Sequence, residues 1–173
     1  LKNKQWGWKE PRTCLFLNSI YHELLPDAKC IIIYRPYNEV IDSFYRREIK
    51  VLKKRSLIKK MYHWVFRIQK SKDEKINTYL KSWIRYNTDI LHFITTKKKQ
   101  DVIVIGLTEL IKDCKNTFQL IQNQFGFELN FKNINDFYDE KLLHSELVKY
   151  PCSKELILEA QLIEEKLKAL SIT

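Results

Sequence analysis

The chain has 173 residues, of which 45% are hydrophobic and 30% charged, so its composition is that of a folded globular domain rather than of a disordered segment. No apolar run approaches the roughly 20 residues needed to cross a bilayer, so the sequence predicts no transmembrane helix. The chain has only 3 glycines, and these 173 residues contain no glycine-rich phosphate loop of the kind found in many nucleotide-binding α/β proteins.

The net charge of +10 comes from one segment of the chain. Residues 46–72 contain eleven Lys and Arg residues and a single acid, Glu48, whereas acidic and basic residues balance elsewhere. An excess this concentrated favours an anionic partner, which can be an acidic or sulfated glycan, a nucleotide, a nucleic acid or an anionic lipid.

The four cysteines show no pattern typical of a metal site. They are Cys14, Cys30, Cys114 and Cys152, and no two of them have CxxC spacing. No histidine is placed to complete a zinc site with them. We therefore expect reduced, buried thiols.

The N-terminal part of the chain predicts alternating strands and helices. Residues 5–9 are expected to form a short strand, and a helix begins at Pro11, whose fixed φ suits a first turn. Residues 29–34 form a continuous apolar run rich in β-branched side chains, which is typical of a strand covered on both faces. A further helix begins at about Asn38 and directs Val40, Ile41 and Phe44 toward a core.

The middle of the chain predicts more helix. Apolar residues at 61–68 indicate one helical stretch. A longer helix begins at Asp73 and Glu74, whose negative charges suit the positive end of a helix dipole. Its apolar residues recur with a period of about 3.6 as far as Ile94, and three lysines at 97–99 follow.

The C-terminal part predicts a second strand followed by two helices. Residues 102–107 form the strand, and Thr108 is expected to cap a helix that continues to Phe125. Gly126 is a suitable stop for that helix, and residues 127–138 are expected to be irregular. Ser153 is expected to cap a final amphipathic helix.

The predicted elements follow the order β-α-β-α-α-α-β-α-α. This order indicates an α/β fold with a parallel sheet flanked by many helices. We expect one domain over residues 1–173, because the sequence contains no internal repeat and no low-complexity linker.

The most informative pair of residues is Arg35 and Ser43. Arg35 stands where the predicted strand at 29–34 would stop, and Ser43 comes eight residues later, about one turn into the next helix. A guanidinium and a hydroxyl so placed can reach one anion, and the helix N-terminus adds its dipole. Ligands of open α/β sheets bind at this carboxyl edge. Alternatively, Arg35 simply caps the strand end or pairs with Glu39.

Four segments of the chain resemble one enzyme family. They are WKEPRT at 8–13, LLPDAKCIIIYRPYNEVIDSFYRR at 24–47, Trp83 with the pair at 86–87, and VIVIGLTEL at 102–110. In these segments the chain resembles sulfotransferases of the bacterial and Golgi-type branch, which includes the carbohydrate and tyrosylprotein enzymes. The resemblance implies a P-loop NTPase-like fold whose first strand and 5′-phosphosulfate loop would precede this chain, so we expect an N-terminal portion to be missing and the chain alone to lack activity.

The resemblance also implies a cofactor, a reaction and roles for individual residues. The cofactor is 3′-phosphoadenosine 5′-phosphosulfate (PAPS), and its sulfuryl group is transferred to a hydroxyl acceptor, a glycan or a similar molecule. Arg35 and Ser43 would hold the 3′-phosphate, and Arg12 would also bind the cofactor. Lys9 would approach the bridging oxygen, where negative charge builds as the S–O bond breaks. Glu10 is the carboxylate nominated as base or orienting group.

Two other functions remain open from the sequence. The first is a non-catalytic basic helical module that binds polyanions such as nucleic acid. For the sulfotransferase itself, nucleic acid is not an expected partner. The second is a fragment of a P-loop nucleotide kinase, which a Walker loop upstream of Leu1 would reveal. The acceptor, the compartment and the oligomeric state stay open.

Overall fold

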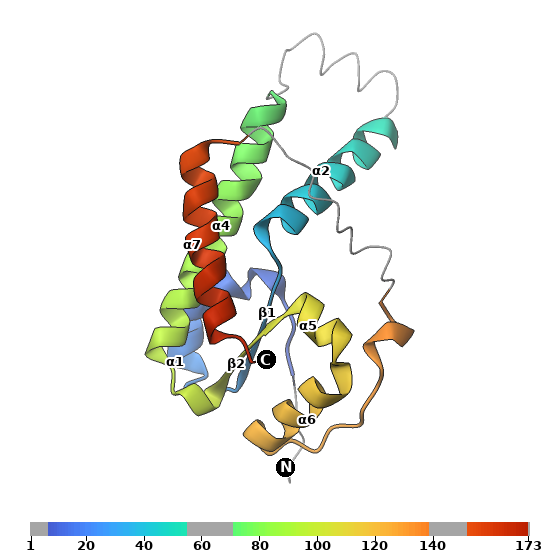
Figure 1. Cartoon of the computed structure of the whole chain (residues 1–173). Coiled ribbons are helices and arrows are strands. Elements are labelled where there is room, and N and C mark those ends of the chain that lie inside the picture. The colour runs from blue at the N-terminus through green and yellow to red at the C-terminus, as the bar shows by residue number, and fades with distance from the viewer. Residues whose placement is uncertain (1–6, 55–70, 139–151, 173) are drawn as a thin grey trace. The chain divides into compact units, whose positions relative to one another are not determined.

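The computed structural model describes residues 7–54, 71–138 and 152–172, and Figure 1 shows their helices and strands. Contacts divide the chain into two compact units. The described residues of the first unit are 7–35, 86–138 and 165–172, and those of the second are 36–54, 71–85 and 152–164. The helix expected at 61–68 lies outside the described residues, and the single domain over 1–173 stays a prediction.

The first unit is built on a parallel pair of strands, β1 (Cys30–Tyr34) and β2 (Val102–Gly106). Tyr34 lies opposite Gly106 in the register, so both carboxyl ends reach the same edge of the sheet. The predicted α/β class with a parallel sheet is therefore confirmed. Within the described residues the sheet has these two strands, and a P-loop NTPase-like arrangement stays a prediction.

The two strands differ in how they are covered. Ile103, Val104 and Ile105 of β2 are all buried, whereas on β1 the side chains of Ile31 and Ile33 are 42% and 52% exposed. The prediction that residues 29–34 are covered on both faces is therefore wrong for β1. Because isoleucine occupies both faces of this strand, the sequence contains no period-2 pattern that would distinguish the covered face from the open one.

The segment before β1 folds differently from the prediction. Gly7–Lys9, the described part of the expected strand at 5–9, has no regular structure, because the chain turns at once into a helical run that Glu10 caps. Residues 5–6 lie outside the described residues. The expected helix does begin at Pro11.

This helical run is not one α-helix. It consists of η1, a 3-10 helix (Pro11–Phe16), η2, a π-helix (Leu17–Tyr21), and one turn of α-helix, α1 (His22–Leu24). In its middle the Asn18 side chain donates a 2.8 Å hydrogen bond to the carbonyl of Asp89, 71 positions further along. Such a tertiary contact overrides the local 3.6-residue pattern from which a regular helix was predicted.

Two helices follow β2 where one was expected. They are α5 (Leu107–Lys112) and α6 (Cys114–Phe125), and Asp113 separates them with φ −133° and ψ 56°. Gly106 occupies the cap position of α5, so the prediction that Thr108 caps the helix is wrong. Asp113 ends the first helix because its backbone leaves the helical region while its N–H still bonds the carbonyl of Glu109.

The end of α6 agrees with the sequence. Gly126 adopts a left-handed conformation with φ +67°, and its N–H donates to the carbonyl of Gln122 at 2.8 Å. Glycine reaches this conformation without a Cβ penalty, which is why it ends helices so often. The rest of 127–138 is irregular as expected, except for a short 3-10 turn, η4 (Ile134–Asp136).

The core of the first unit lies between β2 and α6. Ile103 and Ile105 pack there against Ile121 and Phe125. The backbone N–H of Ile172 donates to the carbonyl of Val104 at 3.0 Å, so the end of the chain is attached to β2.

The second unit is helical. It contains α2 (Tyr37–Lys54), the first part of α4 (Lys72–Thr96) and the first part of α7 (Lys154–Leu170), which Figure 1 shows in red alongside α4 in green. Its buried apolar side chains lie on these three helices and are Ile41, Ile76, Leu80, Trp83, Ile84, Ala160 and Ile163. Helix α7 begins directly after Ser153, and the N–H of Ser153 donates to Asn77 of α4 at 3.1 Å.

The four cysteines are free thiols. Cys14 is buried, whereas Cys30, Cys114 and Cys152 are half-buried, so the expected burial is confirmed for Cys14 alone. Burial raises the pKa of the Cys14 and Cys152 thiols, which keeps them protonated at neutral pH. No group of side chains within 7–54, 71–138 and 152–172 is arranged to hold a metal ion.

The helices of the described residues are too short or too polar to cross a bilayer.

Candidate functional site

The carboxyl edge of the sheet in the first unit holds a cluster of polar groups. Tyr34, which ends β1, is buried, and it lies opposite Gly106 at the end of β2. A methyl group on Gly106 would overlap the Glu109 carboxylate and would lie 3.4 Å from the Tyr34 hydroxyl. Since the φ of Gly106 is −73°, this position requires space rather than a special backbone conformation. Gly106 thus lets a carboxylate and a phenol gather at the edge of the sheet.

Sequence reasoning missed Glu109 as a candidate site residue. It lies in the first turn of α5, three positions after Gly106, and its carboxylate folds back over that glycine. The spacing of an acidic third helical residue behind a cap position was a signal that could have found it.

Arg35 is the first residue after β1, as the sequence predicted. It is half-buried and is the last residue of the first unit. Arg35 therefore stands at the strand end at which open α/β sheets bind their ligands.

Ser43 lies in the second turn of α2 with an exposed side chain, and it belongs to the second unit. The two residues are thus assigned to different units. Their convergence on one phosphate stays a prediction.

The first turn of α2 already contacts an anionic group. The backbone N–H of Tyr37 donates to the carboxylate of Glu164 on α7 at 3.2 Å, and the N–H of Glu39 donates to the Asn38 side chain at 2.9 Å. Glu164 is buried and sits where the helix dipole favours negative charge. No local pattern could have found this residue, because it is 127 positions from Tyr37. A phosphate near α2 would therefore depend on side chains rather than on the Tyr37 N–H.

Glu10 and Arg12 are brought together. The Glu10 carboxylate accepts hydrogen bonds from the backbone N–H of Arg12 at 3.1 Å and from its guanidinium Nε at 2.9 Å, and so caps η1. These bonds hold the pKa of Glu10 below its usual range. A lowered pKa makes Glu10 a weaker base, which favours an orienting role over proton removal.

Lys9 is exposed and lies in the irregular segment directly before this cap. Its ammonium group is therefore reachable by a ligand from solvent. A role at a bridging oxygen stays a prediction.

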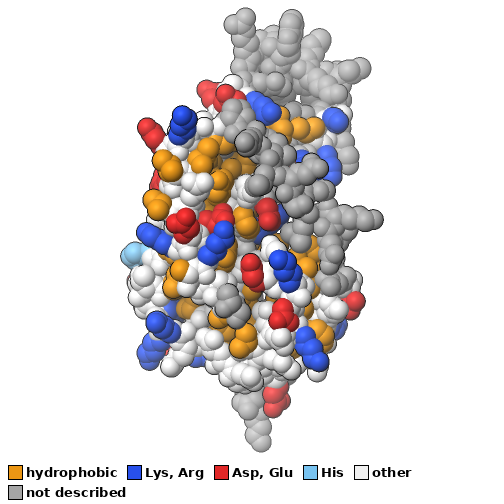
Figure 2. All heavy atoms as spheres, in the orientation of Figure 1, with side chains coloured by type: hydrophobic (Ala, Val, Ile, Leu, Met, Phe, Trp, Pro, Cys, Tyr) orange, Lys and Arg blue, Asp and Glu red, His pale blue; other side chains and the backbone are white. Residues whose placement is uncertain are grey.

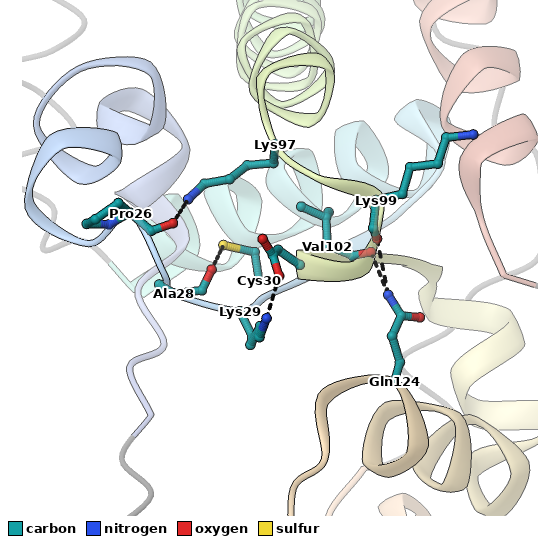
Figure 3. A network of polar contacts seen from close by, with 9 residues as sticks. Pro26, Ala28, Lys29, Cys30, Lys97, Lys99, Val102 and Gln124 are labelled. Atoms are coloured by element: carbon teal, nitrogen blue, oxygen red, sulfur yellow. Dashed lines mark hydrogen bonds and ion pairs between the residues drawn. The ribbon is translucent and has the colours of Figure 1, made fainter.

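The opposite, amino edge of the sheet is held by the contacts drawn in Figure 3. Lys29, directly before β1, forms an ion pair with Asp101, which ends η3 (Lys99–Asp101) directly before β2. The lysine donates a hydrogen bond to this carboxylate and holds the pKa of Asp101 below its usual range. The pair joins the starts of the two strands.

Two further side chains drawn in Figure 3 fix the same edge. The Gln124 side chain of α6 donates to the carbonyls of Lys99 and Val102, each at 3.2 Å. Lys97, just after α4, donates to the carbonyl of Pro26 at 2.7 Å. These side chains have a structural role. By holding the amino ends of β1 and β2 in register, they also align the carboxyl ends of the strands, where the candidate site lies.

The basic helix α2 turns its acids toward partners inside the second unit. Glu48 accepts from Lys75 at 2.8 Å and from the Tyr79 hydroxyl at 2.6 Å, while Asp42 pairs with Arg46 at 2.7 Å. Burial raises the pKa of Tyr79 to about 12, and the hydrogen bond to Glu48 is the second cause of this increase.

On the face shown in Figure 2, red and blue side chains are mixed with orange ones, so positive charge does not dominate that face.

No family model matches the chain, and no curated protein is significantly similar to it. The described residues define an α/β protein with a parallel pair of strands and a polar cluster at their carboxyl edge.

Proposed function

We propose that this chain is a sulfotransferase domain that binds PAPS and transfers its sulfuryl group to a hydroxyl acceptor, such as that of a glycan. The observation that supports this proposal best is the carboxyl edge of the sheet. Two parallel strands end there in register, Arg35 follows the first of them directly, and α2 begins two residues later. This is the edge at which open α/β sheets bind their ligands.

The proposed reaction needs charge stabilisation more than covalent chemistry. The acceptor oxygen forms a bond to sulfur, the bond from sulfur to the donor phosphate breaks, and adenosine 3′,5′-bisphosphate leaves. Arg35 and Ser43 would hold the 3′-phosphate, with Arg12 as a further cofactor contact. Lys9 would stabilise the charge on the leaving oxygen, as cations do in phosphoryl transfer.

The acceptor must also lose a proton. The sequence suggested Glu10 as base or orienting group, but its bonds to Arg12 and its lowered pKa make it a poor base. Glu109 is exposed and its carboxylate lies over Gly106 at the carboxyl edge. We therefore assign Glu10 an orienting role and Glu109 the role of base.

The function is tested by the nucleotide selectivity of the chain. In calorimetric titrations we expect adenosine 3′,5′-bisphosphate to bind at least about tenfold more tightly than 5′-AMP or ATP, since a charged hydrogen bond to the 3′-phosphate contributes about 1.5–3 kcal/mol. Equal affinity for all three nucleotides contradicts the proposal. Salt-sensitive binding of RNA or heparin without this selectivity favours the polyanion-binding module, and preference for ATP favours the kinase fragment.

Replacing Lys9 by alanine is expected to reduce turnover far more than donor binding. The lysine acts on charge that develops in the transition state, so its loss should lower the rate of sulfuryl transfer about 10²–10³-fold while the affinity for the bisphosphate changes little. Transfer of labelled sulfate is measured in the protein expressed from its whole reading frame. Lys115→Ala, an exposed lysine of α6, is the matched control. Normal turnover in Lys9→Ala would refute this role.

A further inference from the structure

Helix α2 carries a stripe of basic side chains on one face. The stripe consists of Arg46, Arg47, Lys50 and Lys53; the last three are exposed, and the Arg46 side chain is 40% exposed. With 100° between successive helical residues, these four side chains fall within an arc of about 120° and extend over about 10 Å of the helix axis. We call this face the α2 stripe.

The acids of α2 do not neutralise the α2 stripe. Glu48 projects from the opposite face and is held by Lys75 and Tyr79, and Asp42 is buried and pairs with Arg46. Glu39 lies in the first turn, before the stripe begins. The charge of Arg47, Lys50 and Lys53 is therefore presented to solvent and complements an anionic surface.

Two exposed apolar side chains border the α2 stripe. Phe44 is 43% exposed and Val51 is 48% exposed, and they lie two turns apart along the same side of the helix. One part of the Phe44 ring is packed against Tyr79, with ring centroids 5.5 Å apart. Cations next to exposed apolar groups suit the boundary between lipid headgroups and acyl chains. A sulfated polysaccharide would be bound mainly through its charges. Single-stranded nucleic acid uses a series of exposed rings rather than one.

We propose that the α2 stripe docks this protein onto the surface of an anionic bilayer. Arg47, Lys50 and Lys53 would contact acidic headgroups, and Phe44 and Val51 would lie at the edge of the acyl region. This is peripheral attachment by one face of a helix. It rests on the second unit alone and does not depend on the proposed sulfotransferase activity.

The proposal is tested by sedimentation of the chain with vesicles. We expect binding to vesicles of phosphatidylcholine with 30% phosphatidylglycerol, none to pure phosphatidylcholine, and weaker binding at higher salt. Each cation close to an anionic bilayer increases the affinity for the vesicles about fivefold. The double variant Arg47→Glu with Lys50→Glu should therefore lower vesicle binding by at least about 25-fold. The control, Lys115→Glu with Lys166→Glu, makes the same change in net charge on α6 and α7 and should lower binding less than about threefold.

Three results would overturn the proposal. One is no binding of the unmodified chain to the anionic vesicles. Another is an equal loss in both double variants, which would mean that net charge rather than the α2 stripe is responsible. The third comes from Val51→Asn, which is expected to lower vesicle binding and leave heparin binding unchanged. If Val51→Asn leaves vesicle binding intact and heparin binds as tightly as vesicles, the partner of the α2 stripe is a soluble polyanion. Circular dichroism confirms that each variant is folded.

Discussion

Replacing Arg35 by alanine is expected to weaken the binding of adenosine 3′,5′-bisphosphate by about 1.5–3 kcal/mol, or roughly 10- to 150-fold. Arg35 follows β1 directly at the carboxyl edge of the sheet. A guanidinium forms charge-assisted, bidentate hydrogen bonds with phosphate, and alanine retains neither the charge nor the bonds. Isothermal titration calorimetry measures the loss. The affinity for 5′-AMP should fall much less, because that nucleotide has no 3′-phosphate.

Two further variants make the Arg35 experiment specific. Arg35→Lys keeps the charge but lacks the planar fork, so its affinity should lie between those of the unmodified chain and Arg35→Ala. Arg85→Ala removes an exposed arginine of α4 and should leave the affinity unchanged. If Arg35→Ala binds the bisphosphate as tightly as the unmodified chain, the assignment of the cofactor is wrong.

Replacing Phe93 by alanine is expected to lower the free energy of unfolding by about 3–5 kcal/mol. Phe93 lies in the part of α4 that belongs to the first unit, and its side chain is completely buried. The Lys97 ammonium lies 5.8 Å from the centroid of its ring. Truncation would remove the buried ring and leave a cavity that the neighbouring side chains fill only partly. Chemical denaturation followed by circular dichroism measures the change.

The same substitution at an exposed phenylalanine provides the control. Phe137 is 74% exposed and its ring lies 5.9 Å from the ammonium of Lys132. Phe137→Ala should change the free energy of unfolding by no more than about 0.5 kcal/mol, as is usual for surface positions. Equal losses at the two positions would show that burial of Phe93 does not stabilise the first unit.

The parts of the fold that the sequence predicted correctly are those with a strong local signal. The apolar runs at 29–34 and 102–107 became β1 and β2, and the 3.6-residue period identified α4 and α7. Gly126 ends α6 because glycine, which has no Cβ, adopts a positive φ without strain.

The errors occurred where contacts distant in sequence decide the structure. Ile31 and Ile33 match a buried strand by residue type, and only the arrangement of neighbouring elements leaves one face of β1 open. The run after Pro11 has an apolar helical period, yet it forms 3-10 and π turns. At Asp113 the helix breaks although no proline or glycine marks the position.

The candidate site divides in the same way. The place of Arg35 at the end of β1 followed from the strand pattern, and the capping of η1 by Glu10 was available from an acidic residue directly before a helical proline. The contact of Glu109 with Gly106 depends on the turn into α5. Glu164 had no local signal at all, because its role depends on the packing of α7 against the start of α2.

The bond between Tyr37 and Glu164 has a consequence for how the protein is made. The two residues are 127 positions apart, so the ribosome releases α2 long before the helix that secures it. During that interval the amphipathic helices α2 and α4 have no α7 to cover them, and such surfaces are prone to aggregation in a nascent chain. A ribosome that stalls before residue 164 would therefore leave a segment that depends on chaperones until α7 has been made.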